Sequence, residues 1–219
     1  IYRTLETYRI QQGKDGKSVW DGDNSKHEIF VYVNWPQGKD PSKTFEEINR
    51  FKKEHPEVLI RVYSEEITNN KVEVGWYKKK VFDLALKKHA ERNNGKDIIL
   101  IANDADMTFA SPYYLEEATN KMNAPENAKL DAMLGRYDLD PGVYEKYPTF
   151  HASIRFWQFM ESVMRSKNGM VGTQGRNTIM RGASYAAVGS NRTREFWADL
   201  VFGQLFDEAR QKSSVAYLN

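Results

Sequence analysis

The chain has 219 residues, and its 32 Lys and Arg against 30 Asp and Glu give a formal net charge of +2, which argues against a nucleic-acid binder that relies on a basic face. Hydrophobic residues make up 40% of the chain and aromatic residues 13%, which is enough apolar material for a folded core and more than a disordered chain carries. The chain has no cysteine, so disulfides, thiolate metal sites and cysteine nucleophiles are excluded.

The chain opens with a helical pattern over 1–10. A polar, glycine-rich segment over 13–27 follows, and it predicts a surface loop or an inserted hairpin. An α/β domain whose first element is a helix often lacks a strand just upstream. We therefore expect the first strand of the domain to be missing and the chain to be a fragment of a longer protein.

The next segments alternate between two kinds. Three short runs are rich in β-branched or aromatic residues and predict buried strands: 28–33, 58–62 and 98–102. Between them, helices are predicted over 44–55, where Thr44 and Glu47 match a capping box, and over 75–92. This alternation of strand and helix indicates the α/β class with a parallel sheet.

The second half follows a less regular pattern. Ser111-Pro112 predicts the start of a helix that runs to about Met122, and a long aromatic-rich loop is predicted over 137–150. The remaining predictions are strands over 128–136, 178–180 and 215–218 and helices over 153–165 and 194–209. No clear linker separates the halves, so we expect a single domain over 1–219.

The acidic segment after the run at 98–102 is the strongest indication of chemistry. Asn103-Asp104-Ala105-Asp106 follows a buried strand, and residues two apart on an extended chain point to the same face, so the carboxylates of Asp104 and Asp106 are expected to converge. Ligands bind outside the carboxyl ends of strands in open α/β sheets, and paired hard oxygen ligands suit Mg²⁺ or Mn²⁺ shared with substrate phosphates. A plain turn or a helix cap is the structural alternative.

The resemblance to a known family goes beyond this motif, because segments across the chain are similar to those of GT-A glycosyltransferases of the family-2 type. The matching segments are IYRTLETYRIQQ, HEIFVYVNWP, VGWYKKKVFDLAL, IILIANDADMTFASPYYLEEA, GTQGRNTIMRGASYAAVG and FWADLVFGQLFDEA. The resemblance implies a GT-A-like, Rossmann-like fold with a mostly parallel central sheet flanked by helices. It also implies a nucleotide-binding half over about 1–110 and an acceptor half over about 111–219.

The activity implied by this resemblance is transfer of a sugar from a nucleoside-diphosphate sugar of the UDP or GDP type to the hydroxyl of a carbohydrate, lipid or protein acceptor, with inversion. The implied cofactor is Mn²⁺ or Mg²⁺. The resemblance assigns metal binding to Asp104 and Asp106, donor binding to Asn34, Lys80 and Asp104, acceptor binding to Asn177 and Arg181, and general base catalysis to Asp199. The residues alone leave four alternatives open: a solvated charge for Lys80, a surface ion pair for Arg181, a turn for Asn177, and an acid in the first turn of a helix for Asp199.

Two other functions stay open. The run Asp104-Ala105-Asp106-Met107-Thr108 also resembles the motif of haloacid-dehalogenase-like phosphatases, in which the first Asp is the nucleophile. The chain is alternatively a sugar-nucleotide-binding module without catalysis. No apolar run approaches the roughly 20 residues of a membrane helix, so we expect a cytoplasmic protein, with membrane association left open, and no nucleic-acid partner.

Overall fold

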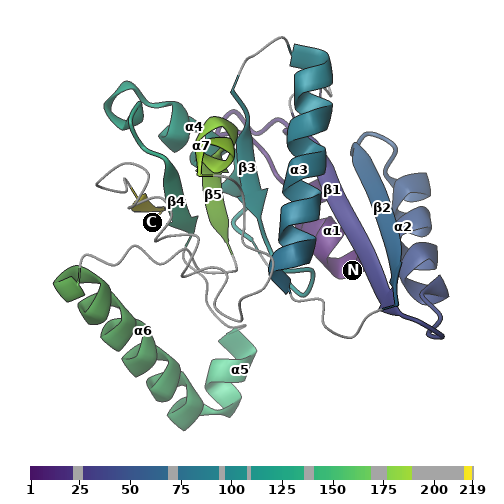
Figure 1. Ribbon diagram of the computed structural model, residues 1–219. Coiled ribbons are helices and arrows are strands. Elements are labelled where there is room, and N and C mark those ends of the chain that lie inside the picture. Colours follow the sequence, from purple (N-terminus) through teal and green to yellow (C-terminus); the bar gives the residue numbers. More distant parts are fainter. Residues whose placement is uncertain are drawn as a thin grey trace.

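The computed structural model describes residues 1–21, 27–68, 74–93, 97–107, 110–135, 141–168, 177–188 and 215–218. Within these ranges helices alternate with strands along the chain (Figure 1). The first part contains α1 (Tyr2–Arg9), β1 (Ile29–Pro36), α2 (Ser42–Glu54), β2 (Ile60–Ile67), α3 (Val74–Asn93) and β3 (Ile99–Ala102). The second part contains α4 (Tyr114–Asn123), the 3-10 helix η1 (Pro125–Asn127), β4 (Ala132–Gly135), α5 (Pro141–Lys146), α6 (Pro148–Asn168), β5 (Thr178–Arg181), α7 (Gly182–Ala187) and β6 (Val215–Leu218).

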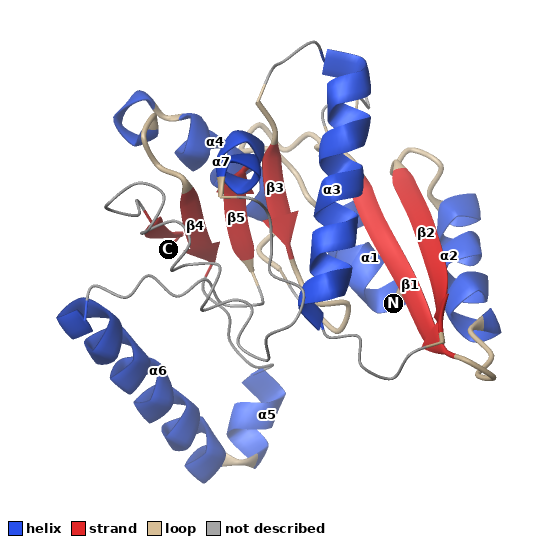
Figure 2. Ribbon diagram, in the orientation of Figure 1, coloured by secondary structure: helices blue, strands red, loops and turns tan. Residues whose placement is uncertain are grey.

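The described strands form two sheets (Figure 2). β1 and β2 pair in parallel, with Ile29 opposite Ile60 and Pro36 opposite Ile67. The larger sheet has the order β3-β5-β4-β6, in which β5 runs antiparallel to both β3 and β4, whereas β4 and β6 are parallel. The mixed α/β class is confirmed. We expected a single, mostly parallel sheet, whereas the described strands form two sheets, the larger of which is mixed. Apolar runs in the sequence predict strands but do not determine which strands pair.

The direction of β5 gives the larger sheet two distinct ends. Ala102, the last residue of β3, lies opposite Thr178, the first residue of β5, and we call this end of the sheet the β3-exit end. Ile99 lies opposite Arg181 at the other end, which we call the β3-entry end. Residues that follow β3 therefore lie at the same end of the sheet as residues that precede β5.

Both faces of the larger sheet are covered by helices. Alternate residues of β3 point to opposite faces, so Ile99 and Ile101 pack against one buried cluster and Leu100 belongs to a second. The second cluster includes residues of α3 and α7, where the rings of Phe82 and Tyr185 meet edge to face at 5.3 Å between centroids. In Figure 1, α3 lies in front of the strands and α1 behind them. This is the layered arrangement of helix, sheet and helix that α/β patterning predicts.

The predicted strands and helices of the first half are confirmed, with shifted ends. The start of α2 differs, because this helix begins at Ser42, whose amide donates to the carboxylate of Asp40 at 2.9 Å. The predicted capping box is wrong. Its carboxylate, on Glu47, instead accepts hydrogen bonds from the amino group of Ile1 at 3.3 Å and from the amide of Tyr2 at 3.1 Å, so a long-range contact replaces the local one.

The second half departs further from expectation. α4 begins at Tyr114 rather than at Ser111-Pro112, because the amide of Tyr114 donates to the carbonyl of Ser111 at 3.0 Å in a preceding turn. The segment 137–150, predicted as a loop, contains α5 and the start of α6. The predicted helix over 194–209 lies outside the described residues. Within the ranges that the structure describes, no helix combines the length and apolar composition needed to cross a lipid bilayer.

Candidate functional site

The acidic motif lies in a tight turn directly after β3. Asp104 and Asp106 are both exposed, and the amide of Met107 donates a hydrogen bond to the carbonyl of Asp104 at 3.3 Å. The expectation that an extended strand aims the two carboxylates is therefore wrong, because Asp and Asn favour turns and this local preference prevails here. Asp104 is the first residue of this turn and Asp106 the third, so the two acids are separated by Ala105 alone.

A buried hydroxyl of α1 contacts this turn. Thr4 has only 6% of its surface exposed, and its hydroxyl donates to the carbonyl of Ala105 at 2.6 Å. Ala105 is the residue between the two acids. The hydrogen bond joins positions 101 residues apart and so ties the first helix of the chain to the end of β3.

A second set of polar contacts holds the residue before the turn. The side-chain amide of Asn103 donates to the phenol oxygen of Tyr8 at 2.7 Å and to that of Tyr114 at 3.4 Å. The hydroxyl of Tyr114 in turn donates to the side-chain carbonyl of Asn177. Side chains from α1, from α4 and from the segment just before β5 therefore meet at the β3-exit end, in a hydrogen-bonded network whose members orient one another.

Asn177 adopts a backbone conformation that few residues other than glycine accept. Its φ of 57° lies in the left-handed region, which Asn tolerates better than most residues. Its carbonyl accepts a hydrogen bond from the amide of Gly135 at 2.8 Å. Its side chain lies against the same glycine, where a Cβ would sit 2.0 Å from Nδ2 of Asn177. Glycine at position 135 therefore makes room for the amide of Asn177.

Burial raises the pKa of both tyrosines in this network. Burial is the main cause for Tyr8, whose pKa rises to about 12, and the hydrogen bond from Asn103 offsets part of the rise. Burial likewise raises the pKa of Tyr114 well above its ordinary value. Both phenols are therefore neutral at physiological pH, and each offers an acceptor oxygen together with a donor hydroxyl.

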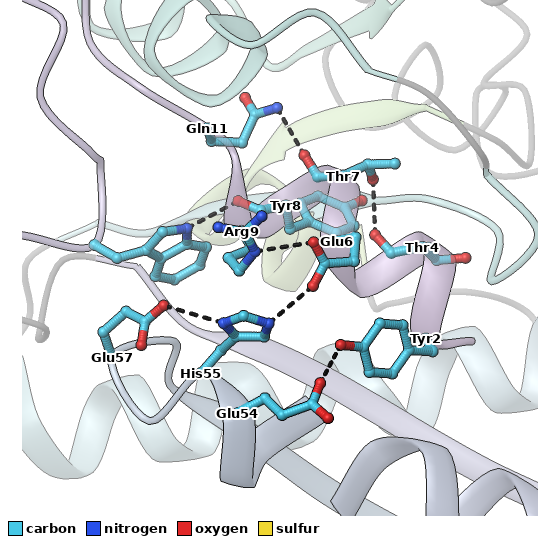
Figure 3. Close-up of polar contacts among 11 residues, drawn as sticks. Tyr2, Thr4, Glu6, Thr7, Tyr8, Arg9, Gln11, Glu54, His55 and Glu57 are labelled. Atoms are coloured by element: carbon cyan, nitrogen blue, oxygen red, sulfur yellow. Dashed lines mark hydrogen bonds and ion pairs between the residues drawn. The ribbon is translucent and has the colours of Figure 1, made fainter. Parts of the chain in front are cut away.

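α1 is itself anchored to the end of α2 (Figure 3). The carboxylate of Glu6 pairs with Nε2 of His55 at 3.0 Å and with Nε of Arg9 at 2.9 Å. The hydroxyl of Tyr2 donates to the carboxylate of Glu54. Because α2 lies beside the smaller sheet (Figure 1), α1 connects that sheet to the turn after β3.

Two predicted donor-binding residues lie together at the smaller sheet. Asn34 is exposed on β1 opposite Glu65 of β2, and the ammonium of Lys80 on α3 pairs with the carboxylate of Glu65. Lys80 also lies over the ring of Trp76, with 4.9 Å between Nζ and the ring centroid. The hydrogen bond from Lys80 is the main reason that the pKa of Glu65 is lowered, and the hydroxyl of Tyr32 adds to it. Asn34 and Lys80 thus both lie at Glu65 of the smaller sheet, whereas the acidic turn follows a strand of the larger sheet.

Arg181 lies at the β3-entry end, opposite the acidic turn. Its guanidinium donates hydrogen bonds to three backbone carbonyls, those of Leu130 at 2.9 Å, Asn127 at 3.3 Å and Met122. It also lies 3.7 Å from the carboxylate of Asp97. The structure therefore does not bring Arg181 together with Asp104 and Asn177, because β5 runs antiparallel to β3 and carries its last residue to the far end of the sheet.

The predicted site residues are thus divided among several places. Those at the β3-exit end are Asp104, Asp106 and Asn177. Asp199, the predicted general base, lies outside the described residues. Sequence reasoning missed Thr4 and Tyr8, although their spacing of four places both on one face of α1 and was a usable signal. Tyr114 gave no such signal, because only the packing of α4 beside β3 reveals its role.

The acidic turn offers two carboxylates to a cation. Among the described residues, no group of three or more His, Cys, Asp or Glu side chains is placed to hold a metal ion. Two carboxylates completed by substrate phosphates and water are, however, the usual ligands of Mg²⁺ in proteins, so Asp104 and Asp106 suit this cation in the presence of a nucleotide. Comparisons with protein-family models, with curated proteins and with solved structures found no match to this chain.

Proposed function

We propose that the protein is a metal-dependent glycosyltransferase of the GT-A type, which transfers a sugar from a UDP- or GDP-sugar to an acceptor hydroxyl with inversion. The observation that carries this proposal is the exposed acidic turn Asp104–Met107 at the carboxyl end of β3. A turn that served only to reverse the chain needs no second acid. Carboxylates at the carboxyl end of a strand lie where α/β sheets bind their ligands.

The arrangement of the strands supports the GT-A-like part of the proposal. β1 and β3 each have one hydrogen-bonded neighbour among the described strands, and both run toward the same end of the molecule in Figure 1. A parallel strand between them would join β2-β1 to β3-β5-β4-β6 in one central sheet, with α3 on one face and α1 on the other.

The chemistry of sugar transfer assigns a role to each group. Asp104 and Asp106 would hold Mn²⁺ or Mg²⁺, and when bound this ion stabilises the negative charge that develops on the departing diphosphate. The proposal keeps Asn34 and Lys80 on the donor side and Asn177 on the acceptor side, and it assigns Asp199 to removal of the proton from the acceptor hydroxyl.

Arg181 is not part of this site. Its guanidinium is engaged with backbone carbonyls at the β3-entry end, where it would be remote from a sugar bound at the acidic turn. A structural role accounts for all of its contacts.

The test is release of UDP or GDP from a panel of nucleotide sugars, measured with and without Mn²⁺. We expect release that requires the metal ion and falls by at least about 100-fold in Asp106→Asn, since several kcal/mol of charge stabilisation are lost. The matched control is Glu126→Gln, which neutralises an exposed acid on η1, near the β3-entry end, and should leave release unchanged.

Three other results would overturn the proposal. Metal-dependent binding of a nucleotide sugar without turnover would identify a non-catalytic binding module. Hydrolysis of para-nitrophenyl phosphate that is lost in Asp104→Asn would identify a phosphatase with Asp104 as its nucleophile. Release that persists in Asp106→Asn would show that the metal ion is held elsewhere.

A further inference from the structure

Thr4, Asn103, Tyr8 and Tyr114, the polar residues behind the acidic turn, have no role in the function proposed so far. We infer that Thr4 and Asn103 are positioning residues, which act through the backbone of the turn to set the directions of the carboxylates of Asp104 and Asp106. Asn103 does so as part of the network with Tyr8, Tyr114 and Asn177. This inference rests on the proposed function, because it concerns the groups that would hold the metal ion.

The first contact acts on the centre of the turn. The hydroxyl of Thr4 donates to the carbonyl of Ala105 at 2.6 Å, and Thr4 is buried. The carbonyl of Ala105 belongs to the peptide group that joins Ala105 to Asp106. Fixing the plane of this peptide limits the backbone torsions on either side of it, and these torsions decide where the two acidic side chains point.

The second contact acts on the residue just before the turn. The amide of Asn103 is held by the phenol oxygens of Tyr8 and Tyr114, at 2.7 and 3.4 Å. Tyr114 donates a hydrogen bond to Asn177, whose side chain fits against Gly135. Asn103 is therefore held directly by two segments of the chain and indirectly, through Tyr114, by a third, which restricts the backbone from which Asp104 follows.

These contacts converge on positions 103 and 105, which flank Asp104, while the two acids themselves are exposed. An arrangement that served only to hold α1 in place would need no contact with the turn, because α1 is already anchored to α2 through Glu6 and His55. In a preformed turn the two carboxylates are already oriented, so less conformational entropy is lost when the metal ion and nucleotide bind.

α1, which carries Thr4 and Tyr8, also lies between the two parts of the proposed donor site. Of the residues proposed for donor binding, Asn34 lies on β1 of the smaller sheet and Lys80 on α3 pairs with Glu65 of β2, whereas the acidic turn follows a strand of the larger sheet. α1 contacts α2 at one side and the turn at the other, so it sets the spacing between the two parts of the proposed donor site.

The test compares Thr4→Val, which removes the hydroxyl and keeps the shape, with Thr4→Ser, which keeps the hydroxyl. Amide hydrogen exchange of the full chain is measured at Met107, whose amide donates to the carbonyl of Asp104 and so closes the turn, with the amides of β2 as an internal reference. We expect Thr4→Val to exchange about 10-fold faster at the turn alone, as the loss of one hydrogen bond implies, and Thr4→Ser to match the wild type.

A second measurement follows the affinity for Mn²⁺ in the presence of UDP. Thr4→Val should weaken it by about 10-fold or more, as substitutions of residues that orient metal ligands do, and Thr4→Ser should restore it. Asn177→Gly provides an independent variant, because it removes the acceptor of Tyr114 and retains the left-handed backbone. It should speed exchange at Met107 and also lower the affinity for Mn²⁺.

The outcomes separate this inference from the function on which it rests. A Met107 amide that exchanges at the wild-type rate in both Thr4→Val and Asn177→Gly would overturn the inference, as would faster exchange spread evenly over β2 and the turn. Mn²⁺ affinity that is unchanged in Thr4→Val but lost in Asp106→Asn would also overturn it while leaving the proposed function intact. If the wild type binds no Mn²⁺ with any nucleotide, the proposed function fails, and the exchange rates still decide whether Thr4 and Asn103 fix the turn.

Discussion

The two ends of the larger sheet use their charged residues in opposite ways. At the β3-entry end, Asp131 is 2% exposed and accepts a hydrogen bond from the buried hydroxyl of Ser184 at 2.6 Å. Arg181, at the same end, donates hydrogen bonds to backbone carbonyls. At the β3-exit end, Asp104 and Asp106 are exposed while uncharged side chains fix the backbone around them.

The difference separates charges that stabilise the fold from charges to which our proposal assigns a ligand. A buried, fully bonded charge is costly to disturb, because removing one partner leaves the others unsatisfied in a medium of low dielectric constant. An exposed acid on a fixed backbone contributes little to stability and stays accessible.

The largest effect on stability is expected at Arg181. Arg181→Met removes the donors for three backbone carbonyls and should lower the free energy of unfolding by about 3 kcal/mol or more. Urea denaturation measures the loss, and Glu126→Gln, an exposed change near the same end, should stay within about 0.5 kcal/mol of the wild type. A loss below about 1 kcal/mol would mean that these hydrogen bonds are not formed.

The same substitution at the two ends gives the sharpest contrast. Asp131→Ala leaves the hydroxyl of Ser184 without its buried acceptor and should cost about 2 kcal/mol, whereas Asp106→Ala should change the free energy of unfolding by no more than about 0.5 kcal/mol. Thermal unfolding of both variants under identical conditions measures the difference. Equal losses at the two positions would show that Asp106 stabilises the fold rather than being presented to a ligand.

The fit between Gly135 and Asn177 gives a third prediction. Gly135→Ala places a methyl group 2.0 Å from the amide nitrogen of Asn177, and overpacking of this kind costs about 1–3 kcal/mol. The double variant with Asn177→Gly should recover much of this loss, because the clashing amide is gone. A double-mutant cycle in urea measures the coupling, and strictly additive effects would rule out the contact.

The last effect, on the pH dependence of stability, is confined to alkaline pH and comes from Tyr8. Burial raises its pKa in the folded protein to about 12 from an ordinary value of 10.0, so the folded state keeps a proton that the unfolded state loses above about pH 10. Stability due to Tyr8 is thus present below pH 10 and declines toward pH 12. Tyr8→Phe should flatten this decline by roughly 1 kcal/mol per pH unit in denaturation curves between pH 10 and 12, and identical slopes would contradict the burial of this phenol.

Much of the secondary structure follows from local sequence. The β-branched runs predict β1, β2 and β3, and the acids after 98–102 are correctly placed at the end of a strand, because these signals depend only on neighbouring residues. The extended geometry assumed for Asp104 and Asp106 failed for a local reason as well, since Asn and Asp favour turns over the continuation of a strand.

The arrangement around the acidic turn was beyond sequence reasoning, because it depends on which strands pair. Asn103 meets Tyr8 and Tyr114 only because α1 and α4 pack beside the end of β3. Arg181 was expected at the acceptor side, and the antiparallel pairing of β5 with β3 carries it to the other end of the sheet. Neither the packing of α1 and α4 nor the direction of β5 can be predicted from the periodicity of a single sequence.

Titration of UDP and GDP into the protein by calorimetry, with and without Mn²⁺, tests most directly whether the acidic turn holds a cation for a nucleotide. We predict binding of one of the two nucleotides that requires Mn²⁺, is lost in Asp106→Asn and is unchanged in Glu126→Gln. Absence of metal-dependent binding in the wild type, or full retention of it in Asp106→Asn, would contradict the account.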